Sequence, residues 1–186
     1  MANIEHYIPF CIKHEAHVKE KLPSETNQDY FERARGKGFT KDSGGSTQTG
    51  LTLDTFRKLK PNATVDDLKR VSYKDWLTCM KKFFWDKISG DSIKSQSVAE
   101  AIMDFFWNSG YSGTKTVQSV LGVKVDGIIG KNTVAAINSR DPYDLWAHIQ
   151  SARYDFFQSR VKSNPDKYKK YLAGWLNRLD AIVYED

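Results

Sequence analysis

The sequence has little cysteine, with only Cys11 and Cys79 among 186 residues. Two cysteines cannot build the disulfide framework of a small secreted scaffold. Both fall on apolar faces of predicted helices, where a free thiol packs as a small hydrophobic group. We therefore expect two buried free thiols rather than a disulfide bond.

Long hydrophobic runs are also missing. No window approaches the roughly 20 apolar residues that a membrane-spanning helix needs, and residues 1–6 do not form a basic region leading into an apolar one. We expect no stable membrane insertion and synthesis in the cytoplasm without a signal peptide. A target outside the cytoplasm would then require another export route.

Several catalytic motifs are absent as well. The sequence has no Gly-x-Ser-x-Gly elbow and no phosphate-binding loop. The run His14-Glu15-Ala16-His17 has its histidines three residues apart, whereas a helical zinc pair needs four. We expect no metal and no cofactor. A helix-turn-helix drawn over residues 114–137 would have too long a turn and too few basic residues, so we expect no nucleic-acid partner.

What is present is enough apolar material for a core, together with a basic surface. Apolar residues make up 40% of the chain and aromatic residues 13%, and the formal net charge is +5 with a pI of about 9.1. Such a charge suits a polyanionic partner: nucleic acid, an anionic membrane or an acidic cell-wall polymer. The length fits one compact domain, or a catalytic part with a small module.

Helical signals dominate the chain from Leu51 onward. Capping patterns predict helix starts at Thr52, Thr64, Ser72, Ser97 (with Glu100), Asp141-Pro142 and Asn164-Pro165. Residues 23–46 show weak periodicity and end in a glycine-rich stretch, which is read as a long loop or a weak β-hairpin. We expect a mainly α fold with eight or nine helices.

One carboxylate interrupts an apolar stripe in the predicted first helix, residues 4–22. The stripe consists of Ile4, Ile8, Cys11, Val18 and Leu22, and the same spacing places Glu15 between Cys11 and Val18. A carboxylate that loses hydration favours its protonated form, which a general acid requires. The alternative is that Glu15 lies at the edge of the stripe and faces water.

Other polar and aromatic residues extend this hypothesis. Glycoside cleavage needs a protonated acid and often uses a second carboxylate. Asp42, in the glycine-rich stretch, is the candidate for the second, and Asp104 is another. Asp104 and Asn108 lie one turn apart on a helix predicted to be buried, where a structural role is an alternative to substrate binding. Trp85, Trp107 and Tyr111 are candidates for stacking on sugars, with core packing as the alternative.

Six motifs, in order, resemble glycoside hydrolase family 108, the N-acetylmuramidases with a C-terminal peptidoglycan-binding region. The family's Glu-Gly-Gly aligns with Glu15-Ala16-His17, and its glycine loop with residues 42–52. The other matches are Phe84-Trp85, Asp104 through Gly110, Val117-Gln118 with Val125 through Thr133, and Gly174-Trp175-Leu176-Asn177-Arg178. Ala16 and His17 replace two glycines, so either the helix continues past Glu15 or His17 enters the cleft.

The resemblance implies a lysozyme-like, mainly α fold, with catalytic residues 1–95 and peptidoglycan-binding residues 96–186 in one globular unit. It implies hydrolysis of the β-1,4 bond between N-acetylmuramic acid and N-acetylglucosamine, with Glu15 as general acid. The expected substrate contacts are Thr47, Gln48, Trp85, Asp104 and Asn108. The expected partner is the peptidoglycan glycan strand, reached by a monomer at the cell wall, with holin-assisted release as one route. The alternative is a wall-binding protein of weak activity that promotes secretion or wall remodelling.

Overall fold

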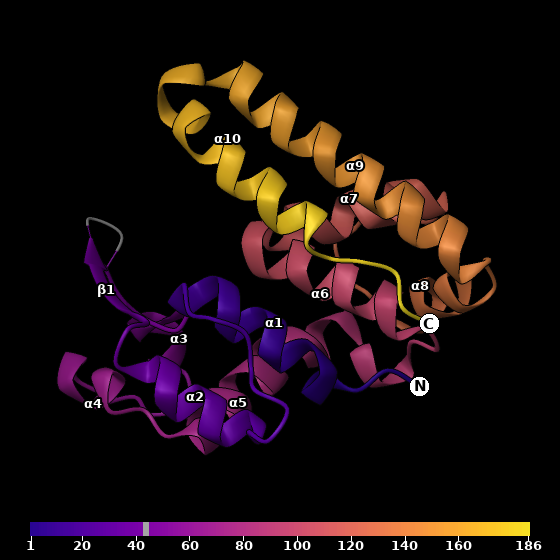
Figure 1. The fold of residues 1–186 in the computed structure, drawn as a ribbon. Helices are drawn as coiled ribbons and strands as arrows, with labels where there is room; N and C mark the ends of the chain where they lie inside the picture. Colours follow the sequence, from indigo (N-terminus) through magenta and orange to yellow (C-terminus); the bar gives the residue numbers. More distant parts are fainter. Residues whose placement is uncertain (43–44) are drawn as a thin grey trace. The chain divides into compact units, whose positions relative to one another are not determined.

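The computed structural model describes residues 1–42 and 45–186 (Figure 1). In these residues it contains ten α-helices and one three-stranded sheet, so the predicted mainly α fold with a strand-forming stretch near the N-terminus is confirmed. None of the described helices is long and apolar enough to cross a membrane. The chain divides into two compact units, residues 4–84 and residues 85–186 with 1–3.

The unit of residues 4–84 holds five helices and the sheet. Strands β1 and β2 pair antiparallel from Phe39↔Gln48 to Asp42↔Gly45, and β2 pairs with β3. The β-hairpin interpretation is therefore correct. The core contains Ile8, Ile12, Phe31, Leu51 and Trp76, all with no exposed surface. The elements are α1 (Ile4–Ala16), α2 (Asn27–Arg35), β1 (Phe39–Asp42), β2 (Gly45–Gln48), β3 (Leu51–Thr52), α3 (Leu53–Arg57), α4 (Val65–Lys69) and α5 (Tyr73–Met80).

The unit of residues 85–186 is built around α6, which the sequence predicted to be buried because it is apolar nearly all round. Nine of its residues are buried. Both chain ends meet its first turn, since Asn3 N donates to Gln96 and Ser97 N donates to Asp186. A short π-helix, η1 (Lys81–Trp85), follows α5 and contains the boundary in the chain between the two units. The elements of the second unit are η2 (Asp86–Ile88), η3 (Gly90–Ser92), α6 (Gln96–Ser109), α7 (Tyr111–Leu121), α8 (Lys131–Asn138), α9 (Pro142–Ser163) and α10 (Pro165–Asp180).

Most predicted helix starts are confirmed. The side chains of Thr52, Thr64, Ser72, Asp141 and Asn164 each cap a helix. The start at Ser97 is wrong, because Ser95 Oγ accepts from Val98 N and Ser97 lies inside α6. The Ser97 hydroxyl instead bonds to Asp186, a partner 89 residues away that local sequence cannot reveal. Cys11 and Cys79 are buried free thiols, as predicted.

The first helix is shorter than predicted. It ends at Ala16 rather than Leu22, because His17 takes a positive φ of 49°. Leu22, expected on the apolar stripe, is 55% exposed. The family's second glycine falls at position 17, and glycine adopts this left-handed conformation freely. His17 adopts the conformation that favours glycine, and its side chain is exposed.

Replacing His17 with Gly is therefore expected to stabilise the protein. A residue with a Cβ is strained in the left-handed region by about 1–2 kcal/mol, and glycine's greater freedom in the unfolded chain offsets part of that gain. We expect a net increase of about 1 kcal/mol in the free energy of unfolding, measured by urea denaturation. His17→Ala keeps the Cβ and is the matched control. A similar gain from both variants would contradict this explanation.

Helix α2 lies within the stretch that the sequence analysis interpreted as a loop. Thr26 and Asp29 form a capping box, and the helix buries Tyr30, Phe31 and Ala34. The Thr-x-x-Asp pattern is the sequence signal for the start of this helix. The segment has few apolar residues, and they form only a narrow stripe, so its periodicity does not indicate a helix.

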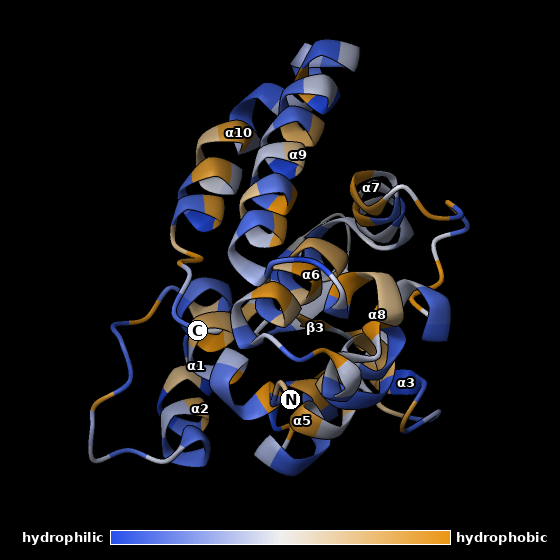
Figure 2. Cartoon of the chain, turned by 90° about the vertical axis from the view of Figure 1, so that its right-hand side faces the viewer, coloured by the Kyte–Doolittle hydropathy of each residue, from blue (hydrophilic) through white to orange (hydrophobic). Residues whose placement is uncertain are grey.

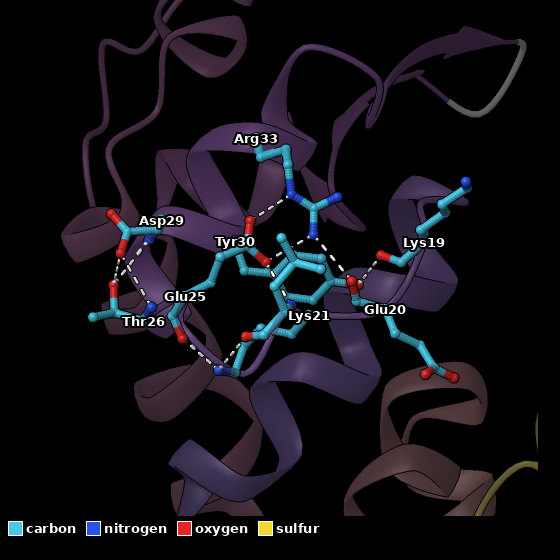
Figure 3. Close-up of polar contacts among 9 residues, drawn as sticks. Lys19, Glu20, Lys21, Glu25, Thr26, Asp29, Tyr30 and Arg33 are labelled. Atoms are coloured by element: carbon cyan, nitrogen blue, oxygen red, sulfur yellow. Dashed lines mark hydrogen bonds and ion pairs between the residues drawn. The ribbon is translucent and has the colours of Figure 1, made fainter.

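The segment after Glu15 is held against α2 by a polar network (Figure 3). Arg33 donates to both carboxylate oxygens of Glu25, at 2.6 and 2.8 Å, and to the Glu20 carbonyl at 3.0 Å. The Tyr30 hydroxyl donates to the Lys19 carbonyl at 2.9 Å. Residues 19–25 are thereby fixed without a helix of their own.

This network makes stability depend on pH. The hydrogen bonds from Arg33 lower the pKa of Glu25 to about 2, from 4.5. A carboxyl group whose pKa is depressed by folding adds stability above its unfolded value, and this is lost as pH falls through the folded one. Arg33→Gln should therefore be less stable than wild type at neutral pH, with the difference shrinking between about pH 4.5 and 2. Urea denaturation against pH measures it, with the exposed Lys37→Gln as control. A difference independent of pH would contradict the role of this pair.

Candidate functional site

Glu15 occupies the last turn of α1. It is half-buried, between the buried residues Ile12 and Ala16. Glu15 is therefore neither fully buried in the apolar stripe nor fully exposed at its edge: part of the residue is covered and part reaches water. A partly covered carboxyl group with solvent access is suited to proton transfer.

The base of the β1–β2 hairpin lies against the residue that follows Glu15. Thr49 N donates to the Gly38 carbonyl at 2.8 Å, and the Trp76 indole donates to the Thr49 carbonyl at 3.1 Å. A Cβ on Gly38 would stand 3.2 Å from Cβ of Ala16 and 2.5 Å from Oγ1 of Thr49. The end of α1 and the hairpin are thus in close contact, and Gly38 permits it.

Gly38→Ala is expected to separate these elements. Forcing a methyl group into such a contact typically costs about 1–3 kcal/mol. We expect a loss of that size in the free energy of unfolding. Gly36→Ala is the matched control, since a Cβ there meets no atom within 4 Å. If the two variants are equally stable by thermal denaturation, the close approach at Gly38 is not required.

One predicted residue, Asp42, lies at the end of β1. The backbone of Asp42 pairs with Gly45, but the Asp42 side chain lies outside the described part of the structure, as do Ser43 and Gly44. Asp42 therefore remains a prediction from the sequence as the second carboxylate. The structure adds that the backbone of Asp42 belongs to the same hairpin as Thr47.

Thr47 and Gln48 differ in accessibility. Thr47 is half-buried, and its hydroxyl shares a cross-strand hydrogen bond with Thr40. Gln48 is fully buried, and its amide nitrogen donates to the Arg35 carbonyl. Thr47 is thus placed for a substrate contact, while Gln48 links β2 to the end of α2.

Trp85 is fully buried. Its indole donates to Asp91 at 2.6 Å, and its ring covers Gly90, where an added Cβ would stand 2.2 Å from a ring carbon. Glycine is required at position 90 for this packing. Trp85 is thus a core side chain, which agrees with core packing, the alternative to stacking on a sugar.

Asp104 and Asn108 have different surroundings. Asp104 has no exposed surface, and its two oxygens lie 2.7 Å from Arg153 Nη2 and 2.8 Å from Arg178 Nη2. Asn108 is exposed and donates to the Asp104 carbonyl one turn back. The buried ion group joins α6, α9 and α10, which favours the structural alternative for Asp104.

The motif from Val125 to Thr133 forms a loop around one buried side chain. Gln118 donates to Asp126 at 2.9 Å and to the Ile128 carbonyl at 3.0 Å, and accepts from Gly127 N at 2.6 Å. The Thr114 hydroxyl donates to the Gly127 carbonyl. The residues of this motif therefore fold into a loop around Gln118. A cavity of about 250 Å³ lies beside the loop and is lined by Lys124, Asp126 and Lys131 among others.

A second cavity lies away from the predicted site. It measures about 500 Å³ and is lined by residues between Phe56 and Asp75, including Lys60 and Arg70. None of the predicted site residues lines it. Its walls carry the ion pair of Lys60 with Asp75 at 2.6 Å.

Comparison with known families identifies the two regions. Residues 36–110 match the model of glycosyl hydrolase 108, and residues 112–180 match a predicted peptidoglycan domain. The chain is thus similar to a glycosyl hydrolase 108 region followed by a predicted peptidoglycan domain. This confirms the resemblance drawn from the six motifs and supports a function that involves peptidoglycan. The first match begins after α1, so Glu15 lies outside it.

A solved structure supports the fold. The chain is similar to SagA of Brucella abortus, with a TM-score of 0.68 and 24% sequence identity, over 82% of this chain and 90% of that one. At this identity the likeness shows the fold. No curated protein matches the sequence.

Proposed function

We propose that the protein is an N-acetylmuramidase that hydrolyses the β-1,4 bond between N-acetylmuramic acid and N-acetylglucosamine. The observation that supports this most is the half-buried Glu15 at the end of α1, next to the contact of Ala16 with the β1–β2 hairpin. The match of residues 36–110 to glycosyl hydrolase 108 supports glycoside hydrolysis as the reaction class.

In this proposal Glu15 protonates the glycosidic oxygen as the bond breaks. Its proton leaves with the leaving sugar, and a water molecule supplies the hydroxyl group that completes the new reducing end. The remaining proton of that water passes to a carboxylate of the site and restores the acid form of Glu15. Asp42 is the proposed second carboxylate, carried at the end of β1. Thr47, on the neighbouring strand, is the proposed hydroxyl contact to the glycan.

Digestion of purified peptidoglycan tests the activity. Reduction of the products with borohydride labels the new reducing ends, which should be N-acetylmuramic acid. Ends at N-acetylglucosamine would contradict the bond assignment. The anomer first released reports on the second carboxylate, since retaining enzymes place it about 5–5.5 Å from the acid and inverting enzymes about 6.5–9.5 Å.

The replacement of the family's glycine pair supports a second candidate, a wall-binding protein of weak activity that promotes secretion or wall remodelling. Ala16 and His17 stand in the turn directly after the proposed acid. Co-sedimentation with peptidoglycan but no release of muropeptides over long incubation would favour this candidate. Substantial turnover would exclude it.

A further inference from the structure

Helices α9 and α10 form an antiparallel hairpin joined at Asn164 (Figure 1). Helix α10 packs on α9, yet Leu179 is the one residue of α10 that is buried. Its other apolar residues are half-buried or exposed, and Figure 2 shows hydrophobic residues interleaved with hydrophilic ones along both helices. An apolar stripe that its own unit leaves uncovered is available for binding.

Three aromatic rings follow one another on this face of α10. Tyr168, Tyr171 and Trp175 stand three and four residues apart, which places them on one side of the helix. The Trp175 ring lies 6.1 Å from Tyr168 and 5.9 Å from Tyr171, centroid to centroid. Trp175 also stacks at 5.2 Å on Phe157 of α9, which is buried. One end of the row is thus anchored in the hairpin, and Tyr171 is 47% exposed.

Cations surround the same rings. The Arg160 guanidinium lies 4.9 Å from the centre of the Tyr168 ring, Lys167 Nζ 5.2 Å from it, and Lys170 Nζ 4.9 Å from the Tyr171 ring. Residues 160–171 contain five Lys or Arg residues and one Asp, in a chain whose formal net charge is +5. Hydrogen bonds from Arg160 and Lys167 lower the pKa of the Tyr168 hydroxyl, as a positive local potential would.

We propose that this aromatic-basic face (Arg160, Lys167, Tyr168, Lys170, Tyr171, Trp175) holds a glycan strand that carries carboxylates, which is the peptidoglycan of the proposed function. The C–H groups on one side of a pyranose ring are weakly positive and pack on the negative face of an aromatic ring. Carboxylates of the stem peptides pair with the lysines and the arginine. The two lysines that lie over the ring faces are exposed, so they can move aside to pair with carboxylates while sugars pack on the rings. Rings and cations together therefore match a polymer in which sugars alternate with acidic branches.

A lipid surface fits this face less well. Membrane-surface helices insert aliphatic and Trp side chains below the headgroups. Within residues 142–180 the large hydrophobic residues that are exposed are Tyr143, Tyr154 and Tyr171, and none is aliphatic. The hydroxyl of a tyrosine favours a wet polar ligand over a bilayer interior.

The test is co-sedimentation of the full chain with insoluble peptidoglycan, in a Glu15→Gln background so that the ligand stays intact. The variant combines Lys167→Gln, Lys170→Gln and Tyr171→Ser, three exposed residues whose change leaves Phe157 and Trp175 packed. We expect binding at least tenfold weaker and less dependent on salt, because two cations and one ring are removed. Lys115→Gln with Lys131→Gln, exposed lysines outside the hairpin, is the matched control and should bind like the parent.

Further measurements separate this proposal from the proposed function. In a chain that keeps Glu15, the three hairpin substitutions should leave the cleavage of short soluble glycan fragments unchanged. The same substitutions should slow the digestion of insoluble peptidoglycan. If the hairpin variant sediments less than its parent and the wild-type protein shows no hydrolysis, the aromatic-basic face is supported and the proposed muramidase activity is contradicted. Equal sedimentation of variant and parent would overturn the proposal, as would binding to anionic phospholipid vesicles with none to peptidoglycan.

Discussion

Glu15→Gln is expected to slow glycan cleavage by about 10²–10⁴-fold. Glutamine keeps the size of the side chain, but its amide is not acidic and cannot transfer a proton to the leaving oxygen. Because Glu15 is only half-buried, the fold should not depend on its charge, and the thermal midpoint should stay close to that of wild type. The rate of new reducing ends per enzyme measures the effect.

Glu20→Gln is the matched control for this experiment. Glu20 is mostly exposed and pairs with Lys13 at 2.7 Å, an arrangement that contributes little stability. Its activity should equal that of wild type. If Glu15→Gln also cleaves at the wild-type rate, Glu15 is not the general acid, and another carboxyl group of the same unit must act.

Asp104→Ala is expected to destabilise the protein by about 3–5 kcal/mol. The substitution leaves Arg153, which is 1% exposed, and Arg178, which is 11% exposed, without their shared carboxylate. A buried cation that loses its counter-ion retains the cost of its lost hydration. Urea denaturation measures the effect. The control is Asp155→Ala, an exposed aspartate of α9, which should change stability by less than about 0.5 kcal/mol.

A double variant distinguishes a structural role for Asp104 from the substrate contact that the sequence predicted. Asp104→Leu with Arg153→Met removes opposite charges together, and buried ion pairs are often replaced by apolar residues at little cost. The double variant should therefore be more stable than Asp104→Leu alone. Unchanged stability in the single variant, with loss of glycan binding, would show instead that Asp104 serves the substrate.

Several of the motifs that resemble the family contact one another in the structure. The Asp of the segment from Asp104 to Gly110 and the Arg of Gly174 to Arg178 are 74 residues apart, yet they form one ion group. Gln118 and the Val125–Thr133 segment likewise form one loop. The sequence alone identifies these residues only as polar groups in apolar surroundings. Their contacts show the buried ion group and the folded loop in which they take part.

The sequence by itself determined the mainly helical fold, because caps such as Asp141-Pro142 and apolar periodicity act over a single turn and require no distant partner. It also placed Glu15 beside the apolar face of α1. Tertiary structure decided where α1 ends, that residues 27–35 form a helix, and which carboxylate lies buried between two arginines. Those outcomes depend on contacts such as Ala16 with Gly38 and Asp104 with Arg153, whose energy exists only when segments far apart in the chain come together.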